Sequence, residues 1–416
     1  MIQSKFEELK PRRHRHSSLA IHPYFGKVDP SIVAAALEHL SSPLQTILDP
    51  FCGSGTVIHD ALLAQRSVIG FDSSPLACMI ATAKVLGITA SEEIQLAEIA
   101  KIVAGDGDLF DKILTHGRES SSHVPQMPRV RSVSDWFGEN SLRELARIRD
   151  IIESFRDQVP PEVYIFARIA FSRIITQASY QKGESTYSRT VKEDSSERVR
   201  KLFKSSVGAV LKSARAFTQE MRDNELDPPC SGRLIISDGI STIKHGAVQA
   251  TIVNRDARET HDQLKGKIAY DLIITSPPYL MSWDYGLYHK FRFYWLGFDL
   301  DSYEETEIGR HLRRRNDDVV RYRSDMASVF ASMHPLANQS AQAVFVNAPS
   351  VVHGQLVDTN VMLRQCAELA GWRYIGSTDS VAIPGPHHGM YASLEARSAA
   401  APGQAGKREH VLVFEA

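Results

Sequence analysis

The chain has 416 residues, 43% of them hydrophobic, and its 48 lysines and arginines nearly balance its 49 aspartates and glutamates. This length and composition predict a soluble globular protein with one large core and room for two or three domains. The balanced charge excludes a globally basic field, so any affinity for nucleic acid must come from local patches. Residues 10–16 and 309–323 are candidates, although both are equally consistent with ordinary solvated surface.

The cysteines and the hydropathy pattern exclude several other classes of protein. The four cysteines contain no CxxC pair, which argues against a zinc site and a disulfide framework, and favours a reducing cytoplasm. His387 and His388 have no partner at ligand spacing, so we predict no metal site. No apolar run approaches the ~18 residues of a membrane span, and the N-terminus lacks a signal-peptide core. We expect a cytoplasmic protein without a membrane partner.

The first recognisable unit is a strand, a turn and a helix within residues 45–65. Apolar Ile47 and Leu48 lead into Asp49, a glycine-bearing loop follows, and apolar residues then recur at helical spacing. A second strand ends on Asp72, about 20 residues beyond the loop, which is the spacing of a βαβ unit. This part of the chain is predicted to be α/β.

Helical patterns dominate from residue 90 onward, and strand patterns resume near residue 248. With the two early strands, the later ones predict a seven-stranded, doubly wound, Rossmann-like α/β sheet with a large helical insertion. We therefore divide the chain into 1–89 and 248–416, which together form the sheet domain, and 90–247, the helical insertion.

The loop DPFCGSGT, residues 49–56, lies where a doubly wound sheet holds its ligand, between a strand's carboxyl end and a helix. Gly53 and Gly55 let the backbone approach a ligand closely, although tight turns before helices also contain glycine for geometry alone. The loop matches neither the phosphate loop nor the GxGxxG pattern of dinucleotide sites. A ligand other than a nucleotide phosphate is indicated.

A second unusual segment, TSPPY at residues 275–279, follows an apolar strand. Pro277 and Pro278 end the hydrogen-bonded ladder and fix a rigid, extended corner. The corner presents the Ser276 hydroxyl, the Pro277 carbonyl and the Tyr279 ring, although a proline-rich turn with a packing tyrosine would look the same.

Together these two segments resemble the first and the catalytic motifs of the S-adenosylmethionine-dependent DNA amino-methyltransferases. The resemblance extends to residues 22–30, 285–299 and 408–416 and leaves out the helical insertion. It implies S-adenosylmethionine as cofactor and double-stranded DNA as substrate.

The resemblance also implies a set of cofactor-binding residues: Lys27, Asp49, Phe51, Gly53, Ser54, Gly55, Thr56, Asp72, Ser73, Asp256 and Ala257. Asp49 and the glycine loop would surround the methionine part, and Asp72 would accept both ribose hydroxyls. Asp256 would accept from the adenine amino group, and Lys27 would neutralise the cofactor carboxylate. The open alternatives are a strand-end or capping role for Asp72, a surface lysine, and an earlier acidic turn with Asp106 and Asp108 in place of Asp256.

The catalytic residues that the resemblance implies are Ser276, Pro277, Pro278 and Tyr279. An exocyclic amino group is a poor nucleophile because its lone pair is delocalised into the ring. The Ser276 side chain and the Pro277 carbonyl would each accept one amino proton, and Tyr279 would stack on a base flipped from the duplex. In this family Asp or Asn at the Ser276 position commonly accompanies adenine, so we favour cytosine N4 over adenine N6.

Other functions remain open from the sequence alone. An RNA or protein-amide methyltransferase, or a catalytically silent nucleic-acid-binding subunit with the same fold, would share much of this pattern. A restriction or other defence-system partner is expected for a DNA methyltransferase. For phosphate contact we favour the basic cluster at 310–323. Five basic residues of the helical insertion could also contact DNA, or could belong to ordinary amphipathic helices: Arg168, Arg173, Lys182, Arg189 and Lys192.

Overall fold

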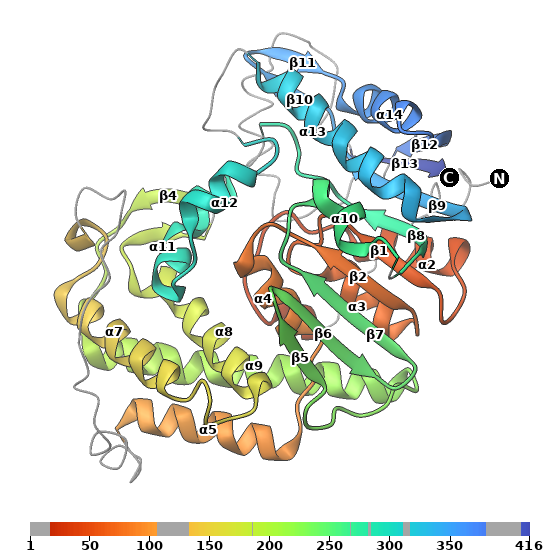
Figure 1. Ribbon diagram of the computed structural model, residues 1–416. Coiled ribbons are helices and arrows are strands. Elements are labelled where there is room, and N and C mark those ends of the chain that lie inside the picture. Colours follow the sequence, from red (N-terminus) through yellow and green to blue (C-terminus); the bar gives the residue numbers. More distant parts are fainter. Residues whose placement is uncertain are drawn as a thin grey trace.

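The computed structural model describes residues 17–105, 133–184, 186–266, 268–281, 284–310, 317–379 and 409–416. The first basic cluster (10–16), the acidic turn with Asp106 and Asp108, and the pair His387 and His388 lie outside these residues. In the described part, a nine-stranded sheet with the order β12-β13-β9-β8-β1-β2-β7-β6-β5 runs through the centre (Figure 1). Its strands are β1 (Thr46–Asp49), β2 (Ser67–Phe71), β5 (Leu234–Ser237), β6 (Ile240–His245), β7 (Val248–Val253), β8 (Tyr270–Thr275), β9 (Ala337–Asn347), β12 (Arg373–Asp379) and β13 (His410–Glu415).

The centre of the sheet is parallel, and the direction of winding reverses beside β1. β1 pairs in parallel with both β2 and β8, β2 pairs in parallel with β7, and β8 with β9. β13 enters antiparallel between β9 and β12. In such sheets the ligand crevice lies outside the carboxyl ends of the strands where the order reverses. That point falls between β1 and β8.

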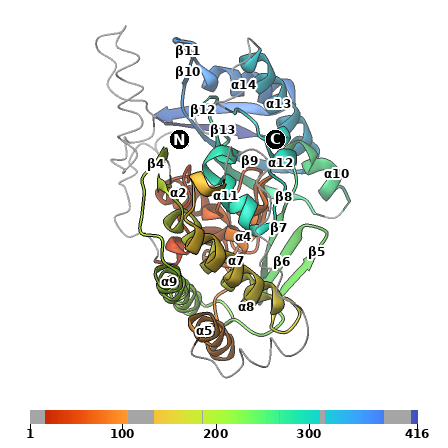
Figure 2. The same ribbon diagram turned by 90° about the vertical axis from the view of Figure 1, so that its left-hand side faces the viewer.

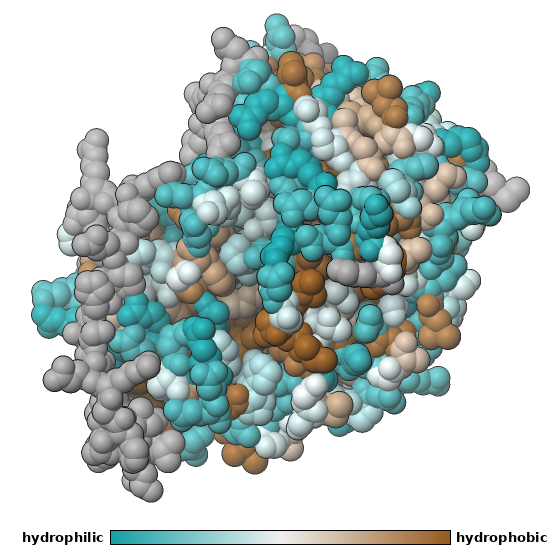
Figure 3. Space-filling view, in the orientation of Figure 1, coloured by the Kyte–Doolittle hydropathy of each residue, from teal (hydrophilic) through white to brown (hydrophobic). Residues whose placement is uncertain are grey.

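All seven predicted strands lie in this one sheet, but the predicted total of seven is wrong because β5 and β6 extend it to nine. β5 and β6 form an antiparallel hairpin within the range predicted to be helical. Asp238 and Gly239 both have positive φ at its turn, which matches the Asp-Gly signature of a tight hairpin. Ile235 and Ile236 on the edge strand are half exposed, and Figure 3 shows hydrophobic side chains where β5 and β6 lie.

Helices cover both faces of the sheet (Figures 1 and 2). Successive strand residues point to opposite faces, so Ile47 packs in one hydrophobic cluster with α3 and α4, whereas Leu48 packs in a second cluster with α13 and α14. The helices are α2 (Pro30–Leu40), α3 (Thr56–Leu63), α4 (Pro75–Lys84), α5 (Ala90–Ala104), α7 (Glu139–Ser154), α8 (Pro161–Ala178), α9 (Ser196–Asp223), α10 (Thr260–Leu264), α11 (Tyr285–Leu296), α12 (Leu300–Thr306), α13 (Asp318–Met333) and α14 (Thr359–Leu369). None of the helices in the described residues has an apolar stretch long enough to span a lipid bilayer.

The helical segment α5 and α7–α9 packs against one side of the sheet domain, as Figure 1 shows. Its apolar faces join the same hydrophobic cluster as α3 and α4, with Ile169 of α8 and Phe217 of α9 fully buried. Because its apolar side chains pack in one cluster with those of the sheet domain, the helical segment is stabilised by that domain. The division at residues 89 and 248 remains a prediction.

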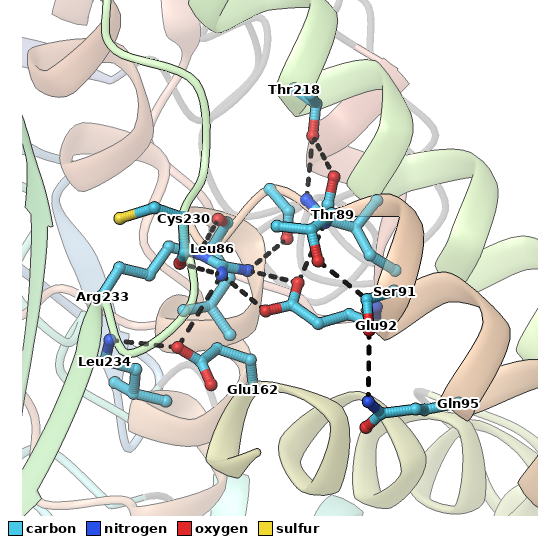
Figure 4. A network of polar contacts seen from close by, with 12 residues as sticks. Leu86, Thr89, Ser91, Glu92, Gln95, Glu162, Thr218, Cys230, Arg233 and Leu234 are labelled. Atoms are coloured by element: carbon cyan, nitrogen blue, oxygen red, sulfur yellow. Dashed lines mark hydrogen bonds and ion pairs between the residues drawn. The ribbon is translucent and has the colours of Figure 1, made fainter. Parts of the chain in front are cut away.

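A buried ion network joins the hairpin to this helical segment (Figure 4). Arg233, just before β5, donates to both carboxylate oxygens of Glu92 on α5 at 2.7 and 2.9 Å. The guanidinium also donates to the Leu86 carbonyl at 2.7 Å, and Glu162 of α8 lies 3.7 Å away. These side chains are almost fully buried. The network therefore fixes three elements relative to one another through charge-assisted hydrogen bonds.

Candidate active site

The glycine loop turns the chain from β1 into α3. Gly53 and Gly55 have φ values of +48° and +76°, in the left-handed region that favours glycine. A Cβ on Gly55 would lie 2.8 Å from the Ala81 Cβ, so glycine is also needed there for α3 to pack against α4. Thr56 is the first residue of α3 and is buried. The backbone conformation therefore requires glycine at both positions, and the packing of α3 on α4 requires it at Gly55.

The glycine loop and the proline corner meet at the carboxyl edge of the sheet. Asp49 ends β1 and Thr275 ends β8, and the Thr275 hydroxyl donates a 2.6 Å hydrogen bond to Asp49 Oδ1. The Phe51 backbone N–H donates to the same oxygen at 3.2 Å. Burial raises the pKa of Asp49 to about 7, against the lowering effect of these two hydrogen bonds. The two motifs therefore form one site around a carboxyl group that titrates near neutral pH.

A second carboxylate, Asp72, stands beside the loop at the end of β2. Its Oδ2 accepts from the Gly53 N–H at 2.9 Å, and its Oδ1 accepts from the Ser74 N–H at 2.8 Å. Burial raises the pKa of Asp72 to about 6, against the lowering effect of those hydrogen bonds. Ser74, and not Asp72, caps α4, and Ser73 lies half-buried between them. Asp72 is thus a fixed carboxylate whose oxygens can each accept a further hydrogen bond.

A buried lysine, Lys84 at the end of α4, contacts the glycine loop. Sequence reasoning missed this residue. Lys84 Nζ donates to Ser54 Oγ at 3.3 Å, and both side chains are buried. Burial, with a smaller contribution from nearby Lys27, holds the pKa of Lys84 well below its usual value. Lys27 itself is exposed. At the end of α4, Lys84 looks in sequence like an ordinary helix-terminal cation, so no pattern would have revealed it.

Asp256 follows β7 at the same edge of the sheet, but its carboxylate is already bound by Arg258. It caps a short 3-10 helix, η3 (Ala257–Glu259), and Ala257 beside it is buried. The Arg258 side chain donates to both carboxylate oxygens at 3.0 Å, and Arg258 also pairs with Asp325. A cofactor amino group would have to share this carboxylate with Arg258, so its role in adenine binding remains a prediction.

The proline corner leaves β8 in a fixed conformation. Ser276 is half-buried, and its Oγ lies 3.5 Å from Tyr279 Oη. Pro277 is buried, and the Pro278 carbonyl accepts from the Tyr322 hydroxyl of α13 at 3.0 Å. These contacts hold the serine hydroxyl and the tyrosine ring on the same side of the corner.

The Tyr279 ring has a further partner that sequence reasoning missed. Tyr279 Oη donates to Glu409 Oε1 at 2.9 Å, and Glu409 precedes β13 in the chain. Glu409 belongs to the segment that resembles the family's closing strand, but nothing in that pattern assigned it a role.

A stack of aromatic rings packs against the glycine loop and was also missed. Tyr24 stacks on Tyr285 and His289 of α11 with ring centroids 5.8 and 5.2 Å apart. A Cβ on Gly53 would lie 3.6 Å from the Tyr24 ring. Gly26 leaves room for the Tyr285 hydroxyl, since a Cβ there would be only 2.1 Å from that oxygen. Residues 22–30 and 285–299, two stretches of the family resemblance, are thus in contact beside the loop.

Arg310, the first residue of the basic cluster at 310–323, is not available for phosphate contact because it is buried in ion pairs. The Arg310 side chain is 10% exposed and lies 2.8 Å from both Asp284 and Glu304. Glu307 lies 3.6 Å away, and burial raises the pKa of that carboxyl to about 8. Arg310 therefore neutralises a buried acidic group beside the proline corner. Residues 311–316 lie outside the described residues.

Three of the five basic residues of the helical segment also have structural partners. Arg168, Arg173 and Lys192 donate to backbone carbonyls at 2.6, 2.7 and 2.6 Å. Lys182 and Arg189 are exposed, and the Arg189 guanidinium lies over the Tyr180 ring. Of these five residues, only Lys182 and Arg189 offer an exposed cation in the structure.

The residues of the site fit S-adenosylmethionine. Gly53 and Gly55 give the loop a left-handed backbone beside two carboxylates of different pKa, Asp49 and Asp72. Carboxylates suit an ammonium group and a pair of ribose hydroxyls. Among the described residues, no group of three or more metal-binding side chains converges at this edge or elsewhere.

Comparison with known proteins points in the same direction. Residues 6–83 match a family model described as DNA methylase, of the N6/N4 methyltransferase type. The chain is 22% identical over 313 residues to the Type II methyltransferase M.MvaI of Kocuria varians, covering 74% of this chain and 62% of that protein. It is 22% identical over 399 residues to the Type II methyltransferase M.MjaII of Methanocaldococcus jannaschii, covering 82% of this chain and 73% of that protein.

A solved structure also aligns with the chain along most of its length. It is the rRNA methyltransferase aviRa from Streptomyces viridochromogenes, with 12% identity, coverage of 97% of this chain and 94% of that one, and a TM-score of 0.31. The chain spans less than two thirds of the length of the Kocuria relative.

Proposed function

We propose that this chain is a DNA amino-methyltransferase of the N4/N6 type and transfers a methyl group from S-adenosylmethionine to an exocyclic amino group of DNA. The family resemblance expected from the sequence is confirmed, whereas the base, the reaction and the residue roles are our inference. The observation that carries the proposal is the 2.6 Å hydrogen bond between Thr275 and Asp49, which joins the cofactor motif to the catalytic motif. A cofactor on one loop and a base on the other would then lie next to each other.

The cofactor would be held by the glycine loop and the two carboxylates. When bound, S-adenosylmethionine supplies an electrophilic methyl group on a sulfonium. Asp72 would accept the ribose hydroxyls, and Asp49 Oδ2, which neither of its described hydrogen bonds uses, would accept from the ammonium group. The buried side chains of Ser54 and Lys84 would support the loop from beneath. The N–H groups of Phe51, Cys52, Gly53 and Gly55 already donate within the protein and hold the loop in shape.

The proline corner would prepare the target nitrogen. The Ser276 hydroxyl and the Pro277 carbonyl would each accept one amino proton, which frees the nitrogen lone pair from the ring and aims it at the methyl carbon. Pro278 holds the turn rigid because its carbonyl is bound by Tyr322. Tyr279 would stack on a base that has been flipped out of the duplex to reach this depth.

We favour cytosine N4 as the target over adenine N6, because a serine occupies the position where the resemblance associates Asp or Asn with adenine. The names of the two relatives favour a restriction-modification setting with double-stranded DNA as substrate. An RNA or protein-amide methyltransferase is the second candidate. A catalytically silent subunit is disfavoured, because the acceptors of the corner and the glycine loop are all present.

Transfer of label from S-adenosylmethionine distinguishes these candidates. The protein is incubated with labelled cofactor and, separately, with duplex DNA, transfer RNA and protein. We expect label on DNA, and we expect the double variant Ser276→Ala/Tyr279→Ala to abolish it while Ser328→Ala, an exposed serine of α13, leaves it unchanged. Label on RNA or protein alone would contradict the proposal, and no transfer by a protein that binds the cofactor would support the silent subunit.

A further inference from the structure

Glu409 connects the catalytic corner to the C-terminal strand. Tyr279 Oη donates a 2.9 Å hydrogen bond to Glu409 Oε1, across 130 positions of sequence. A hydroxyl bound to a carboxylate is a charge-assisted donor, and such bonds are stronger than bonds between neutral groups. Glu409 is therefore a specific partner of the ring that the proposed function places on the target base.

The topology of the sheet explains why residue 409 can reach this corner. β13 runs antiparallel to β9, with His410 opposite Asn347, whereas β8 and β9 are parallel, with Thr275 opposite Phe345. The start of β13 therefore lies at the same edge as the ends of β8 and β9. In a sheet whose centre is parallel, an antiparallel strand brings its first residues to the ligand edge, where the parallel strands bring their last.

We propose that Glu409 is a positioning residue that fixes the Tyr279 ring for stacking on the target base, an inference that rests on the proposed function. A tyrosine at the tip of a corner can rotate about two side-chain bonds. The bond to Glu409 restricts that rotation, and it holds the phenol oxygen 3.5 Å from Ser276 Oγ. The stacking surface and the amino-proton acceptor are then fixed relative to each other before the base arrives.

The charge of Glu409 gives this position a second effect. In the transfer, the amino nitrogen forms a bond to the methyl carbon while the carbon–sulfur bond breaks and its electron pair stays on sulfur. The base therefore gains positive charge before its amino proton leaves. A phenol that donates to a carboxylate has a more electron-rich ring, and an electron-rich ring face attracts a positively charged group stacked on it.

The test is a double-mutant cycle with Glu409→Ala and Tyr279→Phe, measured as the single-turnover rate of DNA methylation and as the affinity for S-adenosylmethionine. Each single variant should lower the rate by about 10-fold, because a hydrogen bond to a charged group is lost. Cofactor affinity should stay unchanged. The double variant should be no slower than the slower single variant, because both changes remove the same bond.

Two control variants separate positioning from a general structural role. Glu409→Gln keeps an acceptor for the hydroxyl but removes the charge, so its rate should lie between those of Glu409→Ala and wild type. Glu415→Ala, at the other end of β13, removes a carboxylate that pairs with Arg373 on the surface and should leave the rate unchanged.

The outcomes that overturn the inference are specific. A rate for Glu409→Ala equal to wild type, rate losses that multiply in the double variant, or equal losses in Glu409→Ala and Glu415→Ala would each reject it while leaving the proposed function intact. If the wild-type protein transfers label to no DNA, the proposed function fails and this inference falls with it.

Discussion

The hydroxyl of Thr275 donates a 2.6 Å hydrogen bond to Asp49, a residue 226 positions earlier in the chain. The bond crosses between β8 and β1, which pair in parallel where the winding of the sheet reverses. It also opposes the effect of burial on the Asp49 carboxyl, whose pKa is about 7. One contact thus joins the proline corner to the glycine loop and opposes the burial that raises the pKa of the loop's acid.

Replacing Thr275 with valine should weaken cofactor binding at neutral pH. The valine side chain has nearly the same shape, but without the hydroxyl the Asp49 pKa should rise above 7. A rise of one unit would lower the ionised fraction of Asp49 at pH 7, and with it the affinity for S-adenosylmethionine, by about fivefold. Isothermal titration calorimetry measures this, with Thr242→Val on the edge hairpin as control. Unchanged affinity would show that Asp49 does not depend on this bond.

Cofactor affinity should fall as the pH is lowered through 7. The Asp49 carboxyl must be ionised to attract an ammonium group, and its pKa of about 7 places the change in the neutral range. We expect the dissociation constant to rise about tenfold between pH 8 and pH 6 for a single such ionisation. Asp49→Asn should bind weakly and show a much flatter profile. An equally steep profile in that variant would assign the titration to another group.

The same ionisation predicts how the cofactor affects stability. Burial raises the folded-state pKa of Asp49 above its unfolded value, so this group favours folding most at low pH and loses that contribution as the pH rises through 7. A bound ammonium group would compensate the buried charge. The increase in melting temperature caused by S-adenosylmethionine should therefore be larger at pH 8 than at pH 6. Thermal unfolding at both pH values measures it, and an equal or reversed increase would contradict the assigned role.

The two acidic residues proposed to hold the nucleoside should differ in their effects. Asp72 is held by backbone N–H groups and can accept further bonds, whereas Arg258 already engages Asp256. Asp72→Asn should weaken cofactor binding by roughly 10-fold or more, since bonds to a charged acceptor contribute about 1.5–3 kcal/mol. Asp256→Asn should have a smaller effect on binding. Competition binding with S-adenosylhomocysteine compares the two, and the reverse order would make Asp256 the principal nucleoside contact.

Removal of the buried cation in Figure 4 should destabilise the protein strongly. Arg233→Met leaves the buried Glu92 and Glu162 carboxylates without their partner, and breaking a buried ion pair in this way costs about 3–5 kcal/mol. Arg215→Met removes a surface pair with Glu93 and should cost at most about 1 kcal/mol. Urea unfolding gives both values. Equal losses would mean that the buried network adds no more stability than the surface pair.

Local patterns in the sequence predicted seven of the nine strands and the two loops that meet at the edge of the sheet. Proline and glycine placement indicates where strands end, and the alternation of apolar residues indicates which strands are buried. The β5–β6 hairpin was predictable too, because Asp238 and Gly239 carry the turn signature, but the surrounding helical patterns hid it.

Partnerships between distant residues were not predictable from local patterns. Arg310 reads as part of a basic surface cluster, yet the fold surrounds it with Asp284 and Glu304. Lys84 and Glu409 stand at the ends of ordinary elements, and only the assembled sheet brings them to the loop and the corner. Such contacts depend on strand order and register, which one sequence specifies only through the complete fold.

The identity of the methylated nucleoside separates the proposed reaction from its alternatives. Duplex DNA incubated with the purified protein and S-adenosylmethionine is digested to nucleosides and analysed by mass spectrometry. A site that holds an amino nitrogen between the Ser276 hydroxyl and the Pro277 carbonyl predicts N4-methylcytosine. N6-methyladenine would keep the amino-group chemistry and overturn the choice of base, whereas 5-methylcytosine, or DNA without any methylated nucleoside, would contradict the account.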